Sequence, residues 1–363
     1  MINVACVKFA GMAAGGCEKY IQTIAILLDK TKYNVDFYYT NAAPFRFSGF
    51  VHPDNSEERR LLCEANGVKT IPVHVDHKIG NREPYEWVGT NFWEKFDESK
   101  YDIVQTSRGG YPEYPFNLIN RVRIVDSIHS FTGQDKPNIV KAILLSKWQA
   151  DSWARNGGNA SKMVIIPSLV YVPELKTDNL REQLGIAPNA FVYGMHQGNR
   201  DDIYSDLSLA AYSQVQGDDK HFVLLGGSGR HRDQANRMGL KNVHFLDFQA
   251  SPEYIHTFLN TIDVFAHSRN DGEVCSAAII EAMYHGKPVI THPALNMGHM
   301  EQVEGCGAVV HNSNEYAAAM RRFCDDRDYY QEMSERTRQR YYEKYDYKKV
   351  EAQIKELYEE VSR

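Results

Sequence analysis

Two glutamates mark the part of the sequence whose residue types could do chemistry. Glu273 lies in a polar loop after a buried apolar run, and Glu281 follows eight residues later inside a predicted helix over 276–285. Ionised carboxylates accept strongly from paired hydroxyls, so the first can bind a sugar and the second a ribose diol. The alternative is that both glutamates are solvated surface residues. The helix start offers backbone N–H groups of Cys275, Ser276 and Ala277 as a cradle for a diphosphate.

A second candidate is the glycine pair Gly15 and Gly16, which follows the first predicted strand and opens the first long helix. Glycines let the backbone approach a ligand closely, and a helix N-terminus attracts an anion. The alternative is a plain glycine-rich turn. The sequence contains neither the Gly-x-Gly-x-x-Gly pattern of nicotinamide binding nor a Gly-x-x-x-x-Gly-Lys-Ser/Thr phosphate loop.

The elements that must position these residues follow an alternating pattern. Short apolar, β-branched runs alternate with helical stretches, which predicts an α/β fold with parallel sheets covered on both faces. Strands are predicted at 2–8, 35–39, 70–75, 102–106, 122–126, 142–146, 163–166, 190–195, 221–226, 243–246, 262–266, 287–291 and 307–310. Helices are predicted at 16–30, 148–156, 205–215, 230–239, 252–260 and 276–285, with a nearly all-helical stretch over 314–363.

The length of 363 residues predicts two domains. We place the hinge near 167–175 and expect a short helix over 177–185 directly after it. In doubly wound sheets, ligands bind beyond the carboxyl ends of the strands, at the point where the strand order reverses. Two such Rossmann-like domains facing each other across a cleft can hold a donor on one side and an acceptor on the other.

Composition excludes several classes of protein. A net charge of −6 and a pI near 6.2 argue against non-specific nucleic-acid binding, although a local basic patch could still contact an anionic membrane. No apolar run is long enough to cross a bilayer, and no secretory signal is recognised. The six cysteines are scattered singly, which favours a cytoplasmic setting without zinc or a disulfide framework. The sequence has no Asp-x-Asp motif at the end of a predicted strand, so it gives no indication of a metal site.

The run from Ile262 to Thr291 resembles the signature of retaining GT-B glycosyltransferases of family 4, the glycosyl transferases group 1 class. The matching residues are Asp263, Ser268, Glu273, Glu281, Ala282, Met283, Gly286 and Pro288. The glycine loop at Gly226 and Gly227 and the N-terminal loop at Gly15 and Gly16 look like further parts of the family pattern.

The resemblance implies an acceptor-binding N-terminal domain at 1–167, a sugar-nucleotide-binding domain at 168–345, and a final helix at 346–363 that crosses back. It also implies that Glu281 binds the ribose, that Glu273 contacts the donor sugar, and that His129 lies beside that sugar. The alternative for His129 is a structural histidine near a strand end. The remaining implied donor-binding residues are Gly15, Gly16, His196, Gly226, Gly227, Val274, Cys275, Ser276 and Ala277.

The sequence departs from the family at the first strand of the second domain. Met195 stands where the family has an arginine, and Arg200 stands where it has a lysine. Arg200 can still grip phosphate with two N–H groups, and His196 is a weaker helper. We therefore expect His129, Glu273 and Arg200 to be the catalytic residues.

The expected reaction moves a hexosyl group from a UDP- or GDP-hexose to an acceptor hydroxyl, with retention and without a metal or other cofactor. The acceptor would be a glycan, a lipid-linked molecule or a small molecule. Two alternatives stay open: a degenerate protein that binds a sugar nucleotide or a partner without turnover, and a sugar-nucleotide epimerase.

Overall fold

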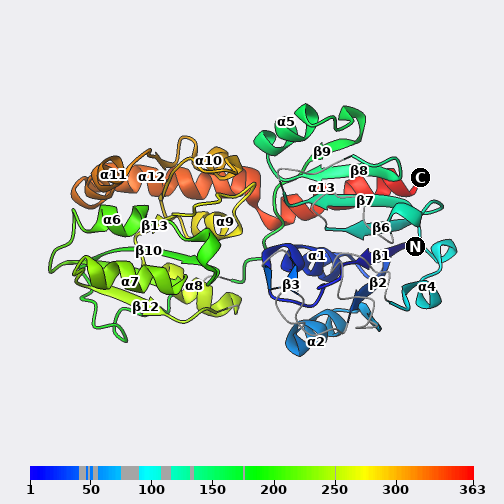
Figure 1. Cartoon of the computed structure of the whole chain (residues 1–363), viewed down its shortest axis with the longest axis horizontal. Helices are drawn as coiled ribbons and strands as arrows, with labels where there is room; N and C mark the ends of the chain where they lie inside the picture. The colour runs from blue at the N-terminus through cyan, green and yellow to red at the C-terminus, as the bar shows by residue number, and fades with distance from the viewer. Residues whose placement is uncertain are drawn as a thin grey trace. The chain divides into compact units, whose positions relative to one another are not determined.

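The computed structural model divides the chain into two compact units (Figure 1). Unit 1 comprises Met1–Leu169 together with Tyr347–Arg363, and unit 2 comprises Val170–Asp346. The structure describes residues 1–40, 46–47, 50–51, 56–74, 90–107, 116–130, 135–174, 176–249 and 251–363. The first boundary lies within the predicted 167–175 hinge, and unit 1 resumes next to the predicted start of the last helix at 346.

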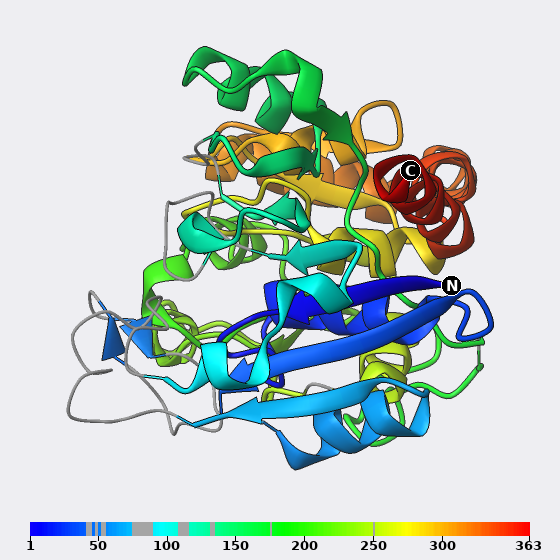
Figure 2. The ribbon, with the colours of Figure 1, turned by 90° about the vertical axis from the view of Figure 1, so that its right-hand side faces the viewer.

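Unit 1 is built on seven parallel strands among its described residues, in the order β5-β2-β1-β6-β7-β8-β9 (Figure 2). Buried apolar residues such as Val4 and Val7 make the first strand a core element. The strands are β1 (Ile2–Val7), β2 (Tyr33–Thr40), β5 (Lys69–Val73), β6 (Ile103–Thr106), β7 (Arg123–Ile128), β8 (Ile139–Leu144) and β9 (Met163–Ile165), with a separate antiparallel pair β3 (Arg46–Phe47) and β4 (Phe50–Val51). The helices are α1 (Gly16–Leu27), α2 (Glu57–Ala65), α4 (Phe92–Lys95), α5 (Lys147–Arg155) and α13 (Tyr347–Ser362).

The last helix, α13, is part of unit 1 although it follows unit 2 in the sequence. Its Tyr358 hydroxyl donates a 2.6 Å hydrogen bond to Oε1 of Gln105 in β6. Glu360 forms a 2.8 Å ion pair with Lys141 of β8. An amphipathic helix thus closes the core of the first sheet with residues from the opposite end of the chain.

Unit 2 has a six-stranded parallel sheet in the order β12-β11-β10-β13-β14-β15. The strands are β10 (Phe191–Gln197), β11 (Lys220–Gly226), β12 (Val243–Leu246), β13 (Val264–Ala266), β14 (Val289–Thr291) and β15 (Gly307–Val309). The helices are α6 (Leu207–Tyr212), α7 (Gly229–Arg237), α8 (Pro252–Thr261), α9 (Ala277–Tyr284), α10 (Gly298–Val303), α11 (Ser313–Asp325) and α12 (Arg327–Arg340), followed by a π-helical turn at Tyr341–Tyr345. The predicted α/β class with two parallel sheets is confirmed.

The strand order locates the edge where a ligand is expected. In unit 1 the order reverses between β1 and β6, and in unit 2 it reverses between β10 and β13. In doubly wound sheets, the loops that leave the two strands at such a reversal form the ligand-binding edge. In unit 2 they are the segments that follow Gln197 and Ala266.

Two local predictions are wrong. The segment 177–185 forms hydrogen-bonded turns, not a helix. Side chains compete for its backbone, because Leu180 donates its N–H to the hydroxyl of Thr261 and Arg181 donates to the Asn179 side chain. The strand predicted at 142–146 is shifted, since β8 ends at Leu144 and the Ser146 hydroxyl instead caps α5 by accepting from the N–H of Gln149.

Candidate functional site

The two loops at the reversal point of the unit 2 sheet are joined to each other. The N–H of Asn270 donates to the carbonyl of Ile203 over 3.2 Å. The Ser268 hydroxyl donates to the Ser205 hydroxyl over 2.9 Å. The loop after β10, which carries Arg200, therefore lies against the loop after β13, which carries Glu273.

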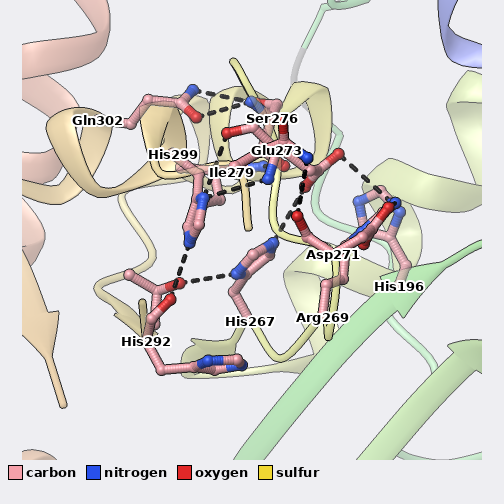
Figure 3. Close-up of polar contacts among 12 residues, drawn as sticks. His196, His267, Arg269, Asp271, Glu273, Ser276, Ile279, His292, His299 and Gln302 are labelled. Atoms are coloured by element: carbon pink, nitrogen blue, oxygen red, sulfur yellow. Dashed lines mark hydrogen bonds and ion pairs between the residues drawn. The ribbon is translucent and has the colours of Figure 1, made fainter. Parts of the chain in front are cut away.

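Glu273 is held in the second of these loops by two basic side chains (Figure 3). Its Oε2 lies 3.0 Å from Nε2 of His267, and its Oε1 lies 3.5 Å from a terminal nitrogen of Arg269. Burial opposes ionisation, but the charge of Arg269 and the hydrogen bond from His267 hold the pKa of Glu273 well below its usual range. Glu273 is therefore an ionised acceptor at neutral pH.

The protonation of His267 follows from its partners. Burial lowers the pKa of His267 to about 4, so the ring is neutral near pH 7 and carries one N–H. An ionised carboxylate only accepts, so this N–H is on Nε2 and points to Glu273. The other nitrogen, Nδ1, accepts from the Thr291 hydroxyl at 2.7 Å. Thr291 at the end of β14 thus orients His267, which orients Glu273.

The backbone around Glu273 is fixed by α10. His299 is fully buried, and its backbone N–H donates to the Glu273 carbonyl at 2.9 Å. Its ring nitrogen Nδ1 lies 3.2 Å from the backbone nitrogen of Glu273. Gln302 accepts from the N–H of Ser276 at 2.7 Å and donates to the Ser276 carbonyl at 3.1 Å (Figure 3). These pairs of hydrogen bonds fix the backbone of the 273–276 loop against α10.

The predicted amide cradle at the start of α9 needs a correction at Ser276. Its N–H is already bonded to Gln302, and its hydroxyl caps the helix by accepting from the N–H of Ile279. Among the described residues, no partner is found for the N–H groups of Ala277 and Ala278, the first two residues of α9. These two amides are the better anion donors. Val274 and Cys275, also predicted at this site, have buried side chains.

Glu281 and His196, predicted separately as donor-binding residues, lie together. Nε2 of His196 at the end of β10 is 3.1 Å from Oε2 of Glu281 in α9, a distance at which the two form an ion pair when the ring is protonated. The His196 ring is held edge-on against the rings of Phe258 and Phe265. Both polar side chains are mostly buried, and the Glu281 carboxylate is 15% exposed.

The two departures from the family pattern are structurally different. Met195 points into the core and is 1% exposed, so it presents nothing at the edge of the sheet. Arg200 is about half exposed and forms a 3.0 Å ion pair with Asp202. The loop after β10 therefore supplies one cation to this edge, and that cation already has an acidic neighbour.

The backbone geometry of the loop after β11 requires glycines. Gly226 and Gly227 have φ values of +76° and +77°, which side chains with a Cβ rarely adopt. A Cβ on Gly226 would lie 2.3 Å from the carbonyl oxygen of Gln197 at the end of β10. This glycine therefore lets the loop after β11 pass close to the end of β10.

The remaining predicted residues belong to unit 1. His129 follows β7 and packs edge-on against Tyr20 of α1, with ring centroids 4.8 Å apart. Its Nε2 is buried and has no hydrogen-bond partner among the described residues. Burial and the charge of Lys8 lower the pKa of His129 to about 3, so the ring is neutral.

Gly15 and Gly16 begin α1, near this histidine's partner Tyr20 in the sequence. A Cβ on Gly16 would meet no atom within 4 Å, so packing does not require a glycine there. Lys8, at the end of β1, lies 3.4 Å from Glu18 in the first turn of α1 and donates to the Ser107 carbonyl at 2.7 Å.

Sequence reasoning missed several residues of this site. His267 and Arg269 lie within the signature run, so their position between β13 and Glu273 was a usable signal. His299 and Gln302 had none, because their contacts with 273–276 depend on where α10 packs.

Two features are absent from the described part of the chain. No group of three or more His, Cys, Asp or Glu side chains is arranged to hold a metal ion. No helix there is both long enough and apolar enough to pass through a bilayer.

Comparison with known proteins agrees with this geometry. Residues 177–340 match the family model "Glycosyl transferases group 1". HepE from Anabaena, solved with UDP and glucose, has a TM-score of 0.74 and 19% identity, covering 98% of this chain and 99% of its own. Sucrose-phosphate synthase from Thermosynechococcus elongatus has a TM-score of 0.77 and 16% identity, covering 99% of both chains. A glycosyltransferase from Rickettsia africae has a TM-score of 0.74 and 14% identity, covering 99% of this chain and 98% of its own.

No curated protein matches the sequence. At these identities the structural likeness shows the fold, and the family model matches residues within the second unit. Residues 177–340 of this chain match the model of the glycosyl transferases group 1 family, and the two parallel-sheet units of the chain have the GT-B glycosyltransferase fold.

Proposed function

We propose that this protein moves a hexosyl group from a nucleoside-diphosphate sugar to an acceptor hydroxyl, with retention at the anomeric carbon and without a metal. The observation that carries the proposal is the pair Glu273 and Glu281, which lie on either side of the two unpartnered amides that begin α9. One carboxylate is ionised in the loop, and the other contacts His196 at the sheet edge. Such a site suits a ligand with hydroxyls at two ends and negative charge between them.

In the proposed binding mode, each group has one task. Glu281 accepts from the ribose hydroxyls, and Glu273 accepts from a hydroxyl of the donor sugar. The amides of Ala277 and Ala278 and the guanidinium of Arg200 bind the diphosphate. His129 of unit 1, whose buried Nε2 lacks a partner among the described residues, is a further proposed sugar-binding residue.

Catalysis then comes from positioning and from stabilisation of the leaving group. The bond between the anomeric carbon and the phosphate oxygen breaks, and its electron pair stays on the diphosphate. The acceptor oxygen bonds to the same face of the sugar, and its proton passes to the leaving phosphate. HepE is solved with UDP-glucose, which makes UDP-glucose the first donor to test. A reducing, cytoplasmic setting is part of the proposal because none of the six cysteines, all of them described residues, forms a disulfide.

The first experiment measures donor binding and slow donor hydrolysis in EDTA, with a panel of UDP- and GDP-hexoses. We expect one donor to raise the melting temperature of the wild type, since a ligand that binds the folded state stabilises it. Glu281→Gln should lower the affinity for that donor by about tenfold or more, because it removes a hydrogen bond to a charged group. Glu335→Gln, an exposed glutamate in α12, is the matched control and should bind normally.

The outcomes separate the candidate functions. Failure of every donor to bind, with or without Mg²⁺, would overturn the proposal. Inversion at the anomeric carbon, read by NMR of the product, would overturn retention. Binding without hydrolysis or transfer to any acceptor would favour the second candidate, a nucleotide-sugar-binding protein without turnover. The burial of Met195 at the family's arginine position is the observation that favours this second candidate.

A further inference from the structure

The proposed donor site is short of positive charge. A departing diphosphate gains negative charge as its bond to the sugar breaks, and preorganised cations stabilise it. Met195 is apolar and buried, so it supplies none. Arg200 is half exposed and paired with Asp202. A further cation near the start of α9 would stabilise this charge.

Arg269 is a mostly buried cation in the loop that leads to Glu273. Its side chain is 18% exposed. Asp271 forms a bidentate contact with it: Nε of Arg269 donates to Oδ1 at 2.9 Å, and a terminal nitrogen donates to Oδ2 at 2.8 Å. This geometry fixes the plane of the guanidinium, so little side-chain freedom remains to be lost when a ligand binds.

Some N–H groups of the Arg269 guanidinium remain available to a ligand. It has five N–H groups, and two of them are directed to Asp271. A third lies near Oε1 of Glu273, at the long distance of 3.5 Å. Among the described residues, the other two N–H groups have no partner. Planar N–H pairs of this kind match phosphate oxygens.

Arg269 and Arg200 are brought to the same edge of the sheet. The loop contacts from Asn270 to Ile203 and from Ser268 to Ser205 lie directly beside the two arginines in the sequence. Asp202, the partner of Arg200, is also close enough for its charge to act on Arg269. The two cations therefore belong to one cluster.

We propose that Arg269 is a catalytic residue that binds the diphosphate of the donor, as the second cation in place of the residue that Met195 does not supply. This inference rests on the proposed function. In the transfer step, the electron pair of the breaking sugar–oxygen bond moves onto the phosphate oxygen, and the remaining N–H groups of Arg269 donate to the diphosphate that carries this charge.

The test compares a free nucleotide with its nucleoside, UDP with uridine and GDP with guanosine, by calorimetry on the full chain. We expect Arg269→Gln to weaken nucleoside diphosphate binding by about tenfold or more while nucleoside binding changes less than about twofold. Arg269→Lys should restore part of the affinity, because it keeps the charge without the planar fork. Arg336→Gln, an exposed arginine in α12, is the matched control.

The free nucleotide carries no sugar, which separates Arg269 from Glu273. Glu273→Gln should leave the ratio of nucleotide to nucleoside affinity unchanged, whereas Arg269→Gln should lower it. An equal loss for nucleotide and nucleoside, or no loss for either, would overturn the role of Arg269 while the proposed function stands. If the wild type binds neither UDP nor GDP, the proposed function and this inference both fail.

Discussion

Glu273 shows how single residues set the chemistry of this site. A carboxylate with low exposure would tend to become neutral, but His267 and Arg269 each contact one of its oxygens and keep it ionised. His267 is in turn oriented by Thr291. The charge and the direction of the carboxylate are thus fixed before any ligand arrives, which is the condition for electrostatic catalysis.

At the same scale, Gln302 determines whether the loop that carries Glu273 stays in place. Gln302→Leu would leave both the N–H and the carbonyl of Ser276 buried without their present partner. We expect the free energy of unfolding to fall by about 1–3 kcal/mol. Amide hydrogen exchange over 273–279 should also become faster, and donor affinity should fall. Urea unfolding, exchange measured by mass spectrometry and calorimetry check the three expectations.

Gln234→Leu is the control for this change. Gln234 is also buried, and its side chain bonds the Asp206 carbonyl and the Tyr204 hydroxyl. It should lose similar stability without faster exchange over 273–279. If the two variants exchange alike in that segment, Gln302 has only a general structural role.

At the scale of elements, short connections place the site. Ser276 caps α9, and Gly286, with φ of +65°, ends it before β14. Helix α9 therefore begins directly after the Glu273 loop and directs its first amides to the same edge of the sheet. The glycine loop between β11 and α7 brings a further helix start to that side of the fold.

The glycine loop gives a test at this scale. Gly227→Ala should lower the free energy of unfolding by about 1–3 kcal/mol, because φ is +77° and the new Cβ would lie 2.3 Å from Cδ2 of Leu224. Gly16→Ala is the contrast, since its Cβ would meet no atom within 4 Å. It should be neutral or stabilise by up to about 1 kcal/mol. Equal destabilisation in urea titrations would contradict this explanation.

At the scale of the whole molecule, buried histidines make stability depend on pH. Burial lowers the pKa of His231 and His267 to about 4 and that of His285 to about 3. The unfolded chain therefore binds more protons than the folded chain below about pH 6.5, and stability falls as pH decreases from there toward 4. The lowered pKa of Glu273 acts in the same direction at lower pH.

Urea unfolding at about pH 7 and pH 5 measures this effect. Each buried histidine should contribute about 1.4 kcal/mol per pH unit inside the window. His231→Leu should reduce the slope, while His311→Gln, at an exposed position, should not. A free energy of unfolding that is equal at both pH values would show that the folded protein takes up these protons as readily as the unfolded chain.

Local patterns in the sequence were sufficient for the α/β class, the parallel sheets and most element positions. Burial of strands between helices leaves a continuous apolar run, and caps and glycines mark helix ends, so these signals lie within a few residues of each other. The signature run also predicted that Glu273 and Glu281 flank one helix start. The 177–185 helix failed because the Asn179 side chain accepts from the backbone N–H of Arg181, which a helix beginning after Thr177 would bond to its own backbone.

The tertiary structure decided which groups of the site are engaged. His196 and Glu281 are 85 residues apart and meet because β10 lies beside β13 and α9 follows it. The N–H of Ser276 looked available from the helix start, yet Gln302, 26 residues later, takes it. The position of Arg269 within the signature run does not show which of its N–H groups are bonded, and the contacts with Asp271 and Glu273 decide this. A sequence shows which groups can donate or accept, whereas the packing of distant segments decides which of them are already paired.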